Sequence, residues 1–166
     1  MFQIGDYVMY KTDGVCKVDQ ITTMEDFHQN KQKKLYYVLV PIKDSGIKIY
    51  SAVDNTQIPR RLAMTEKEAR EMVDSMTEIP VLKIENEKYR EDCYKKALKS
   101  GDCKEWIRIV KTIYLRRQGR LAEGKKSTAI DDYYLNAAEQ LVLAELSFSM
   151  GMTADEIQKY IEQRTK

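Results

Sequence analysis

The chain has 166 residues, which suffices for two small domains, and its 43% hydrophobic residues can form a buried core. A net charge of only +2 argues against a polycation. Three scattered cysteines and one histidine argue against a structural zinc site, and no apolar run is long enough for a secretion signal or a membrane span, so we expect a cytoplasmic protein with reduced thiols and no membrane contact.

Residues 2–53 have the composition of short β-strands. We predict strands in DYVMYK, GVCKVDQITTM, KLYYVLVPI and IKIYSAV. Turns at Gly14 and at Asp44-Ser45-Gly46, and a polar loop from Glu25 to Lys33, separate them. Alternation in the last strand gives two faces, one with Ile49, Ser51 and Val53 and the other with Lys48, Tyr50 and Ala52. Residues 1–58 therefore predict a small barrel-like sheet of the Tudor or SH3 type.

After Pro59 the hydrophobic period becomes helical. We expect a linker over residues 59–80 that contains one short helix, starting at a capping box of Thr65 and Glu68. A helical domain follows over residues 81–166. Its predicted helices run from Glu85 to Lys99 before Ser100-Gly101, from Asp102 to Gln118 with a capping box to Glu105, from Thr128 to Ser149, and from Thr153, capped with Glu156. The fold class is α+β, an all-β module followed by an all-α module.

The single tryptophan lies on the second long helix. Trp106, Ile109, Val110 and Ile113 recur at the i, i+3, i+4, i+7 spacing of a buried stripe, with Ile107 and Tyr114 on its flank and Lys104, Arg108 and Lys111 opposite. The facing seam is expected at Ala137, Leu141, Ala144 and Leu146. The spacing favours core packing of Trp106 over contact with a nucleic acid base.

The charge is unevenly distributed along the chain. Residues 88–126 hold thirteen cationic and five acidic side chains, a net charge of +8, so the remainder carries −6. A basic surface of this kind attracts phosphates without reading a sequence. The alternative is that these lysines and arginines only solvate helix faces.

No pattern of catalytic chemistry is present in the sequence. A glycine-rich phosphate loop, a GxSxG elbow and an HExxH helix are all missing. His28 stands in the polar loop without an evident partner for proton transfer and is interpreted as a solvated residue. Asp131 and Asp132 suit the first turn of a helix better than a catalytic pair. We predict a protein that is not an enzyme and takes no cofactor, metal or small-molecule substrate.

The order of these features resembles the CarD/CdnL family of bacterial transcription regulators, whose N-terminal module is shared with the transcription-repair coupling factor. The similarity is carried by FQIGDYVMYKTDGVCKV, YYVLVPI, VDN, LKSGDCKEWIRIVKTIYLRR and AEQLVLAEL, which span nearly the whole chain in the expected order. It implies a nucleoid-associated bacterial protein. The Tudor-like module would bind the RNA polymerase β subunit, largely by strand pairing. The helical module would lie on promoter DNA and stabilise the open complex.

The resemblance also implies two sets of contact residues. Those for the polymerase are Met24, Lys48, Ile49, Tyr50 and Ser51. Those for DNA phosphates are Lys95, Lys96, Lys99, Arg108, Lys111, Arg116, Arg117, Lys125 and Lys126, with Tyr89 as the candidate for a base step.

The chain departs from the family pattern in two places. A tryptophan that the family wedges into the unwound base step is replaced by Glu87, with Tyr89 the nearest aromatic residue; a purely structural role for Tyr89 is the alternative. Met24 and Tyr50 stand where the family often has arginines that contact the polymerase. These departures leave open an alternative function, that of a polymerase-binding adaptor that has lost DNA binding. An RNA-binding module is a third possibility, although no RNP or KH signature supports it.

Overall fold

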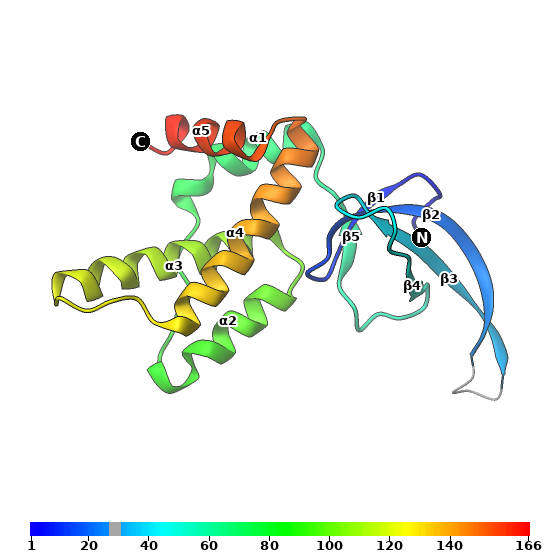
Figure 1. The fold of residues 1–166 in the computed structure, drawn as a ribbon, viewed down its shortest axis with the longest axis horizontal. Coiled ribbons are helices and arrows are strands. Elements are labelled where there is room, and N and C mark those ends of the chain that lie inside the picture. The colour runs from blue at the N-terminus through cyan, green and yellow to red at the C-terminus, as the bar shows by residue number, and fades with distance from the viewer. Residues whose placement is uncertain (27–30) are drawn as a thin grey trace. The chain divides into compact units, whose positions relative to one another are not determined.

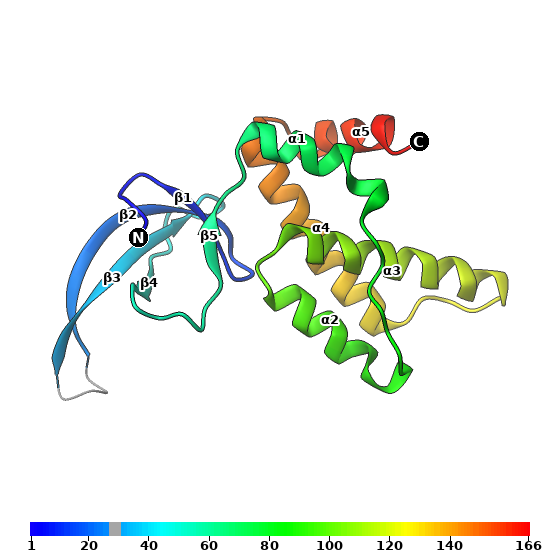
Figure 2. The ribbon, with the colours of Figure 1, turned by 180° about the vertical axis from the view of Figure 1, so that it is seen from behind.

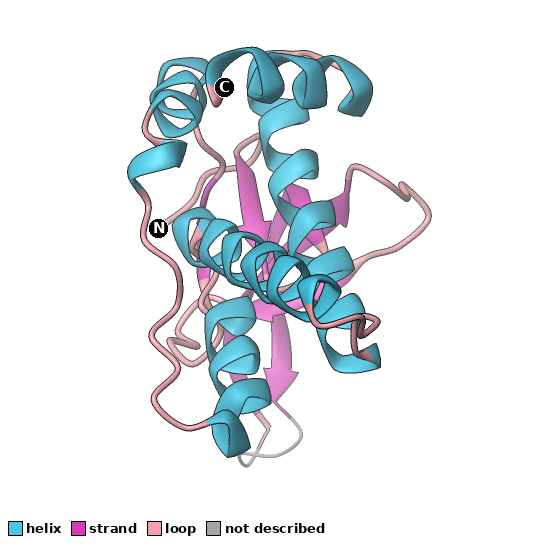
Figure 3. Ribbon diagram, turned by 90° about the vertical axis from the view of Figure 1, so that its left-hand side faces the viewer, coloured by secondary structure: helices cyan, strands magenta, loops and turns pink. Residues whose placement is uncertain are grey.

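The computed structural model describes residues 1–26 and 31–166, and their contacts divide the chain into two compact units, Met1–Ala63 and Met64–Lys166. The first unit contains the strands and the second the helices (Figures 1 and 3), so the predicted α+β class is confirmed. No helix in the described residues is long and apolar enough to cross a membrane. His28 lies outside the described residues.

The first unit is a five-stranded antiparallel sheet in the order β4-β3-β2-β1-β5. Its strands are β1 (Tyr7–Tyr10), β2 (Gly14–Asp26), β3 (Gln32–Pro41), β4 (Ile49–Ala52) and β5 (Arg60–Leu62). The first four are the predicted strands, but Glu25, Asp26, Gln32 and Lys33, which we expected in a polar loop, belong to β2 and β3. The sequence did not predict β5, because three residues next to Pro59 show no strand pattern.

The predicted barrel is wrong, because the sheet stays open. In the part of the chain that the structure describes, β4 and β5 are the two edges and no backbone ladder joins them. A side chain bridges them instead: the Arg60 guanidinium donates to Ser51 Oγ (2.9 Å) and to the Ala52 carbonyl (2.7 Å). The arginine fork therefore links the two edges without a backbone ladder.

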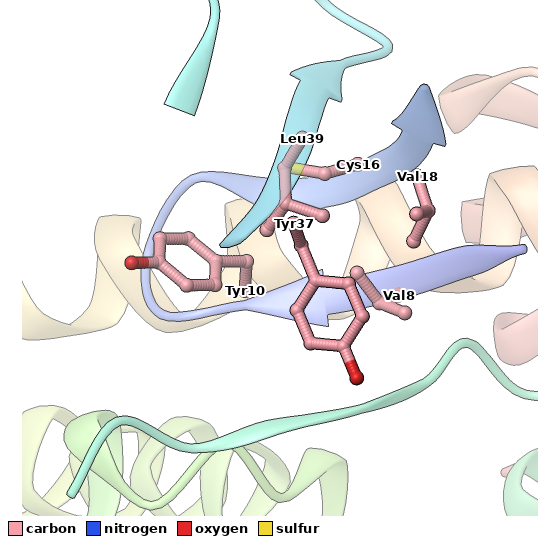
Figure 4. Close-up of a cluster of buried hydrophobic side chains, with 6 residues drawn as sticks. All are labelled: Val8, Tyr10, Cys16, Val18, Tyr37 and Leu39. Carbon is pink, nitrogen blue, oxygen red and sulfur yellow. The ribbon is translucent and has the colours of Figure 1, made fainter. Parts of the chain in front are cut away.

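The inner face of this curled sheet holds the core of the first unit. Figure 4 shows the cluster, which consists of Val8, Tyr10, Cys16, Val18, Tyr37 and Leu39. Ile49 and Val53 pack against it, and Ser51 is only 2% exposed, whereas Tyr50 is 51% exposed. The predicted alternation of faces along β4 is therefore confirmed.

The second unit consists of five α-helices and two short 3-10 turns. In chain order these are α1 (Glu66–Asp74), η1 (Met76–Glu78), η2 (Glu87–Tyr89), α2 (Arg90–Lys99), α3 (Cys103–Ala122), α4 (Ala129–Met150) and α5 (Ala154–Arg164). Figures 1 and 2 show α1 and α5 beside the C-terminal end of α4, with α2 and α3 along its other half. The helix that we expected in a linker is α1, and it belongs to this unit.

Helix caps explain most of the boundaries. The capping boxes of Thr65 with Glu68 and of Thr153 with Glu156 are confirmed at α1 and α5. The one predicted for α3 is wrong: Asp102 accepts from the Lys104 amide, while the Glu105 carboxylate pairs with Arg108 instead.

Three helix ends also bear on the predictions. Gly101 has the left-handed φ of +74° that ends α2, as predicted. At its other end, α2 begins at Arg90 rather than at Glu85, because the preceding residues form η2. In α3 the helix runs through Gly119, because the cost of one exposed glycine does not break a long packed helix.

Trp106 lies in the core, as predicted. Its side chain is fully buried, and Nε1 donates to the Leu98 carbonyl at 3.0 Å. Ile109 and Ile113 are fully buried beside it on α3.

The predicted seam on α4 is partly wrong. Leu141 and Leu146 are buried as expected, but the fully buried alanine is Ala138 rather than Ala137 or Ala144. The same stripe includes Glu145, whose carboxylate is fully buried and accepts from the Met64 amide at 3.3 Å. A hydrophobic pattern cannot locate a stripe that contains a buried acid.

Trp106→Ala should lower the free energy of unfolding of the helical unit by about 3–5 kcal/mol, because it leaves a large cavity and an unpaired Leu98 carbonyl. Denaturant titration followed by circular dichroism measures this. Leu121→Ala is the control, since Leu121 is 76% exposed and should change the midpoint little. Equal midpoints for the two variants would contradict the core assignment.

Candidate functional site

The residues expected to contact the polymerase lie mainly on one edge of the sheet. Tyr50 is 51% exposed on β4, and Lys48 is exposed immediately before that strand. Ile49 is half-buried and Ser51 is buried under the Arg60 guanidinium, so both point to the inner face. Met24 is 38% exposed on β2, and β3 separates it from this edge.

The register of β3 with β4 fixes which backbone groups face outward. The Val53 amide donates to the Leu35 carbonyl at 2.9 Å, which makes this pair a hydrogen-bonded one. Alternation then directs the backbone groups of Ser51 toward Tyr37 of β3, and those of Tyr50 and Ala52 away from the sheet. We call this outward side of β4 the pairing edge.

A cleft of about 460 Å³ lies beside the pairing edge. Tyr36, Tyr50 and Ile58 give it apolar surface, and Lys34 and Asp54, whose charged atoms are 3.9 Å apart, give it polar surface. The cleft can hold side chains of a segment that pairs with β4.

The cations expected to contact DNA fall into two groups by their partners. Five are exposed lysines, which are Lys95, Lys96, Lys99, Lys125 and Lys126. Lys95 lies 3.8 Å from Glu91, and Lys125 lies 3.1 Å from Glu123. Lys96, Lys99 and Lys126 make no ion pair within the described residues, so their ammonium groups can meet external anions.

The other four predicted cations have partners within the helical unit. Arg108 donates to the carbonyls of Pro80 and Val81, each at 3.3 Å, and pairs with Glu105 at 2.8 Å. The Lys111 ammonium donates to three carbonyls at the end of η1, those of Met76, Thr77 and Ile79. These two cations hold the segment 76–81 against α3.

Arg116 and Arg117 hold the start of α4. Arg117 donates a hydrogen bond to the exposed Asp132 carboxylate. This contact is the main reason that the pKa of the Asp132 carboxyl lies below its ordinary value. Arg116 reaches further inward, where its Nε lies 3.3 Å from Asp131. The position of the two acids in the first turn of α4 is as predicted.

Asp131 is fully buried and joins three helices. Tyr94 of α2 donates its hydroxyl to the Asp131 carboxylate at 3.0 Å, and Arg90 Nε of α2 and Arg116 Nε of α3 each lie 3.3 Å from it. Burial, together with the Asp131 charge, raises the pKa of the Tyr94 hydroxyl well above its ordinary range. We call these four side chains the Asp131 hub.

Glu87 extends the hub to the surface. Both of its carboxylate oxygens accept from Arg116 Nη1, at 3.0 and 2.9 Å, and one accepts from Arg90 at 3.2 Å. Two residues further on, Tyr89 is 52% exposed, and Lys88 Nζ lies 5.8 Å from its ring centroid. Arg90 is a site residue that the sequence did not predict, although its i, i+3 spacing from Glu87 could have indicated the pair.

Comparison with known protein families identifies both units. Residues 2–63 match the family model described as the CarD-like/TRCF RID domain, and residues 71–162 match the one described as the CarD C-terminal domain. No curated protein matches the chain.

Asp131→Ala should lower the free energy of unfolding by about 3–5 kcal/mol, because it leaves two arginines and a tyrosine without their buried partner. Thermal and denaturant unfolding of the full chain measure this. Asp132→Ala removes the same charge from the same turn but from an exposed position, and should cost far less. If the two variants were equally stable, the hub would not be what joins the helices.

Proposed function

Because the chain belongs to the CarD family of non-enzymatic, RNA polymerase-interacting transcription regulators, we propose that it binds the polymerase β subunit through the pairing edge and promoter DNA through exposed lysines. Contact with DNA is made to phosphates and is independent of sequence, and it changes the stability of the open complex. The observation that carries this proposal is a set of exposed lysines, three of them without an ion pair among the described residues, beside arginines that are held internally.

The polymerase contact is supported by the geometry of β4. An edge strand with outward amide and carbonyl groups can accept an extended segment of another protein, which gains affinity from backbone hydrogen bonds. Tyr50 and Met24 are neutral, so they cannot form the salt bridges that the family's arginines would make. Backbone pairing does not depend on those charges, and the cleft beside Tyr50 gives a partner side chain a place to bind.

The DNA contact is supported by the division of the predicted cations into exposed lysines and side chains with partners inside the helical unit. Lys95, Lys96 and Lys99 lie exposed on α2, and Lys125 and Lys126 lie in the turn between α3 and α4. A solvent-exposed ammonium group can neutralise a phosphate, release the counterion condensed on the DNA there, and leave the internal contacts of the protein intact. We therefore assign the phosphate contacts to these lysines ahead of Arg108, Lys111, Arg116 and Arg117.

Tyr89 remains the candidate for contact with an unstacked base. Its ring is half-exposed beside Lys88, and aromatic side chains stack on bases regardless of sequence. The adaptor alternative rests on repulsion between Glu87 and phosphates. Arg90 and Arg116 offset the Glu87 charge, which weakens that repulsion and favours retained DNA binding.

The polymerase contact is tested by titrating the full chain with the isolated polymerase β lobe. We expect saturable binding that Tyr50→Pro abolishes, because proline removes an outward amide from the pairing edge. Tyr133→Ala, at a 65% exposed site of the other unit, is the control and should leave the affinity unchanged. Absence of binding by the unmodified chain would overturn the polymerase contact.

The DNA contact is tested by the salt dependence of binding to promoter duplexes. Replacing Lys95, Lys96 and Lys99 with glutamine should weaken binding and reduce the slope of log K against log salt by about 0.9 for each phosphate that is no longer neutralised. Replacing the exposed Lys67, Lys83 and Lys159 with glutamine removes the same charge elsewhere in the unit and should leave the slope unchanged. Equal effects of the two sets would contradict the assignment.

The same titrations separate the remaining possibilities. Tyr89→Ala should leave the salt slope unchanged and weaken binding only to duplexes with an unpaired region, because stacking adds no counterion release. If the unmodified chain did not bind promoter duplexes, the adaptor would be the better description. Stronger competition by single-stranded RNA than by duplex DNA would favour the RNA-binding alternative.

A further inference from the structure

We infer that Arg60 limits where a partner strand can pair with β4, so that the usable part of the pairing edge ends at Tyr50 and excludes Ala52. This inference rests on the proposed strand contact with the polymerase β subunit, and it specifies the register of that contact. Arg60 acts here as a positioning residue.

The Arg60 guanidinium is bound along the end of β4 and the turn that follows. It donates to Ser51 Oγ at 2.9 Å and to the carbonyls of Ala52, Val53 and Asn55 at 2.7, 3.1 and 2.8 Å. Its carbon also lies 5.3 Å from the Tyr37 ring centroid. A planar fork with four acceptors and an aromatic contact is fixed in position, which a lysine in its place would not be.

The Ala52 carbonyl is the acceptor that a partner strand would need next after Tyr50. It points away from β3, but it already accepts from Arg60 and, at 3.1 Å, from the Asn55 amide. A carbonyl oxygen has two lone pairs, so no acceptor capacity remains at Ala52. An incoming amide would also face the N–H groups of the guanidinium, which are donors themselves.

The backbone of Tyr50 is in the opposite situation. Its amide and carbonyl point outward and have no hydrogen-bond partner within the described residues. A partner strand can therefore exchange hydrogen bonds at Tyr50 and extend toward Lys48, but not toward Ala52.

This limit determines both the register and the kind of partner. If the added strand shifted toward Ala52, it could not form hydrogen bonds with the Ala52 carbonyl. The register that pairs the strand with Tyr50 is therefore favoured. The partner is a short extended segment of the β subunit that passes Tyr50 and continues toward Lys48.

Amide hydrogen exchange of the full chain, free and bound to the isolated β lobe, tests this inference. On binding, exchange at the Tyr50 amide should slow by at least about tenfold, while the Ala52 amide should stay within about twofold of its rate in the free protein. Protection of Ala52 equal to that of Tyr50 would overturn the inference and leave the polymerase contact intact. If no complex forms, the polymerase contact fails and the inference fails with it.

Variants provide a second measurement. Arg60→Met should extend protection in the complex to the Ala52 amide, because the freed Ala52 carbonyl lets a partner residue sit opposite Ala52 and exchange both hydrogen bonds with it. Arg61→Met is the matched control. It removes the same charge from the next residue of β5, which pairs with Met9 and so lies on the face opposite the core cluster, and it should leave Ala52 unprotected. Should Arg60→Met fail to fold, exchange in the unmodified chain decides the question alone.

Discussion

The Asp131 carboxylate is buried where water cannot solvate it, and the arrangement of α2, α3 and α4 depends on how its charge is compensated. A buried carboxylate costs several kcal/mol unless cations and donors surround it. Arg90 and Tyr94 of α2 and Arg116 of α3 meet that need, and each can do so only with its helix in place. The hub therefore sets the position of α2, which carries the lysines that we assign to DNA.

The first unit uses an arginine in a comparable way. The Arg60 side chain reaches from one edge of the open sheet to the other. It donates hydrogen bonds to the carbonyls of Ala52, Val53 and Asn55, with which no strand pairs in the described part of the chain. Guanidinium groups suit both places, because their fixed fork can bind several acceptors at once. The lysines of α2, whose ammonium groups are strongly hydrated, remain on the surface, whereas the Lys111 ammonium binds backbone carbonyls. Arg60, Arg90 and Arg116 thus stabilise the two units internally, and the exposed lysines are the cations that we assign to phosphates.

Sequence patterns predicted the features that depend on neighbours along the chain. The capping boxes of α1 and α5, the left-handed Gly101 and the buried Trp106 all follow from local spacing. The patterns failed where distant residues decide the outcome. Only the partner strand β1 makes β5 a strand, and only the fold buries Glu145 within the seam of α4. For the same reason no pattern could separate the exposed Lys96 from Arg116, whose partners lie 15 and 29 residues away.

The hub also changes the meaning of Glu87. A carboxylate at the position of a DNA wedge suggests lost function if it is considered alone, because phosphates repel it. In the structure its oxygens accept from two arginines that also surround Asp131, so two carboxylates share two cations and the site is close to neutral. Glu87 thereby anchors η2, which also carries the half-exposed Tyr89. The residue that first argues against a base contact thus holds the turn that carries Tyr89, the aromatic side chain that we propose for that contact.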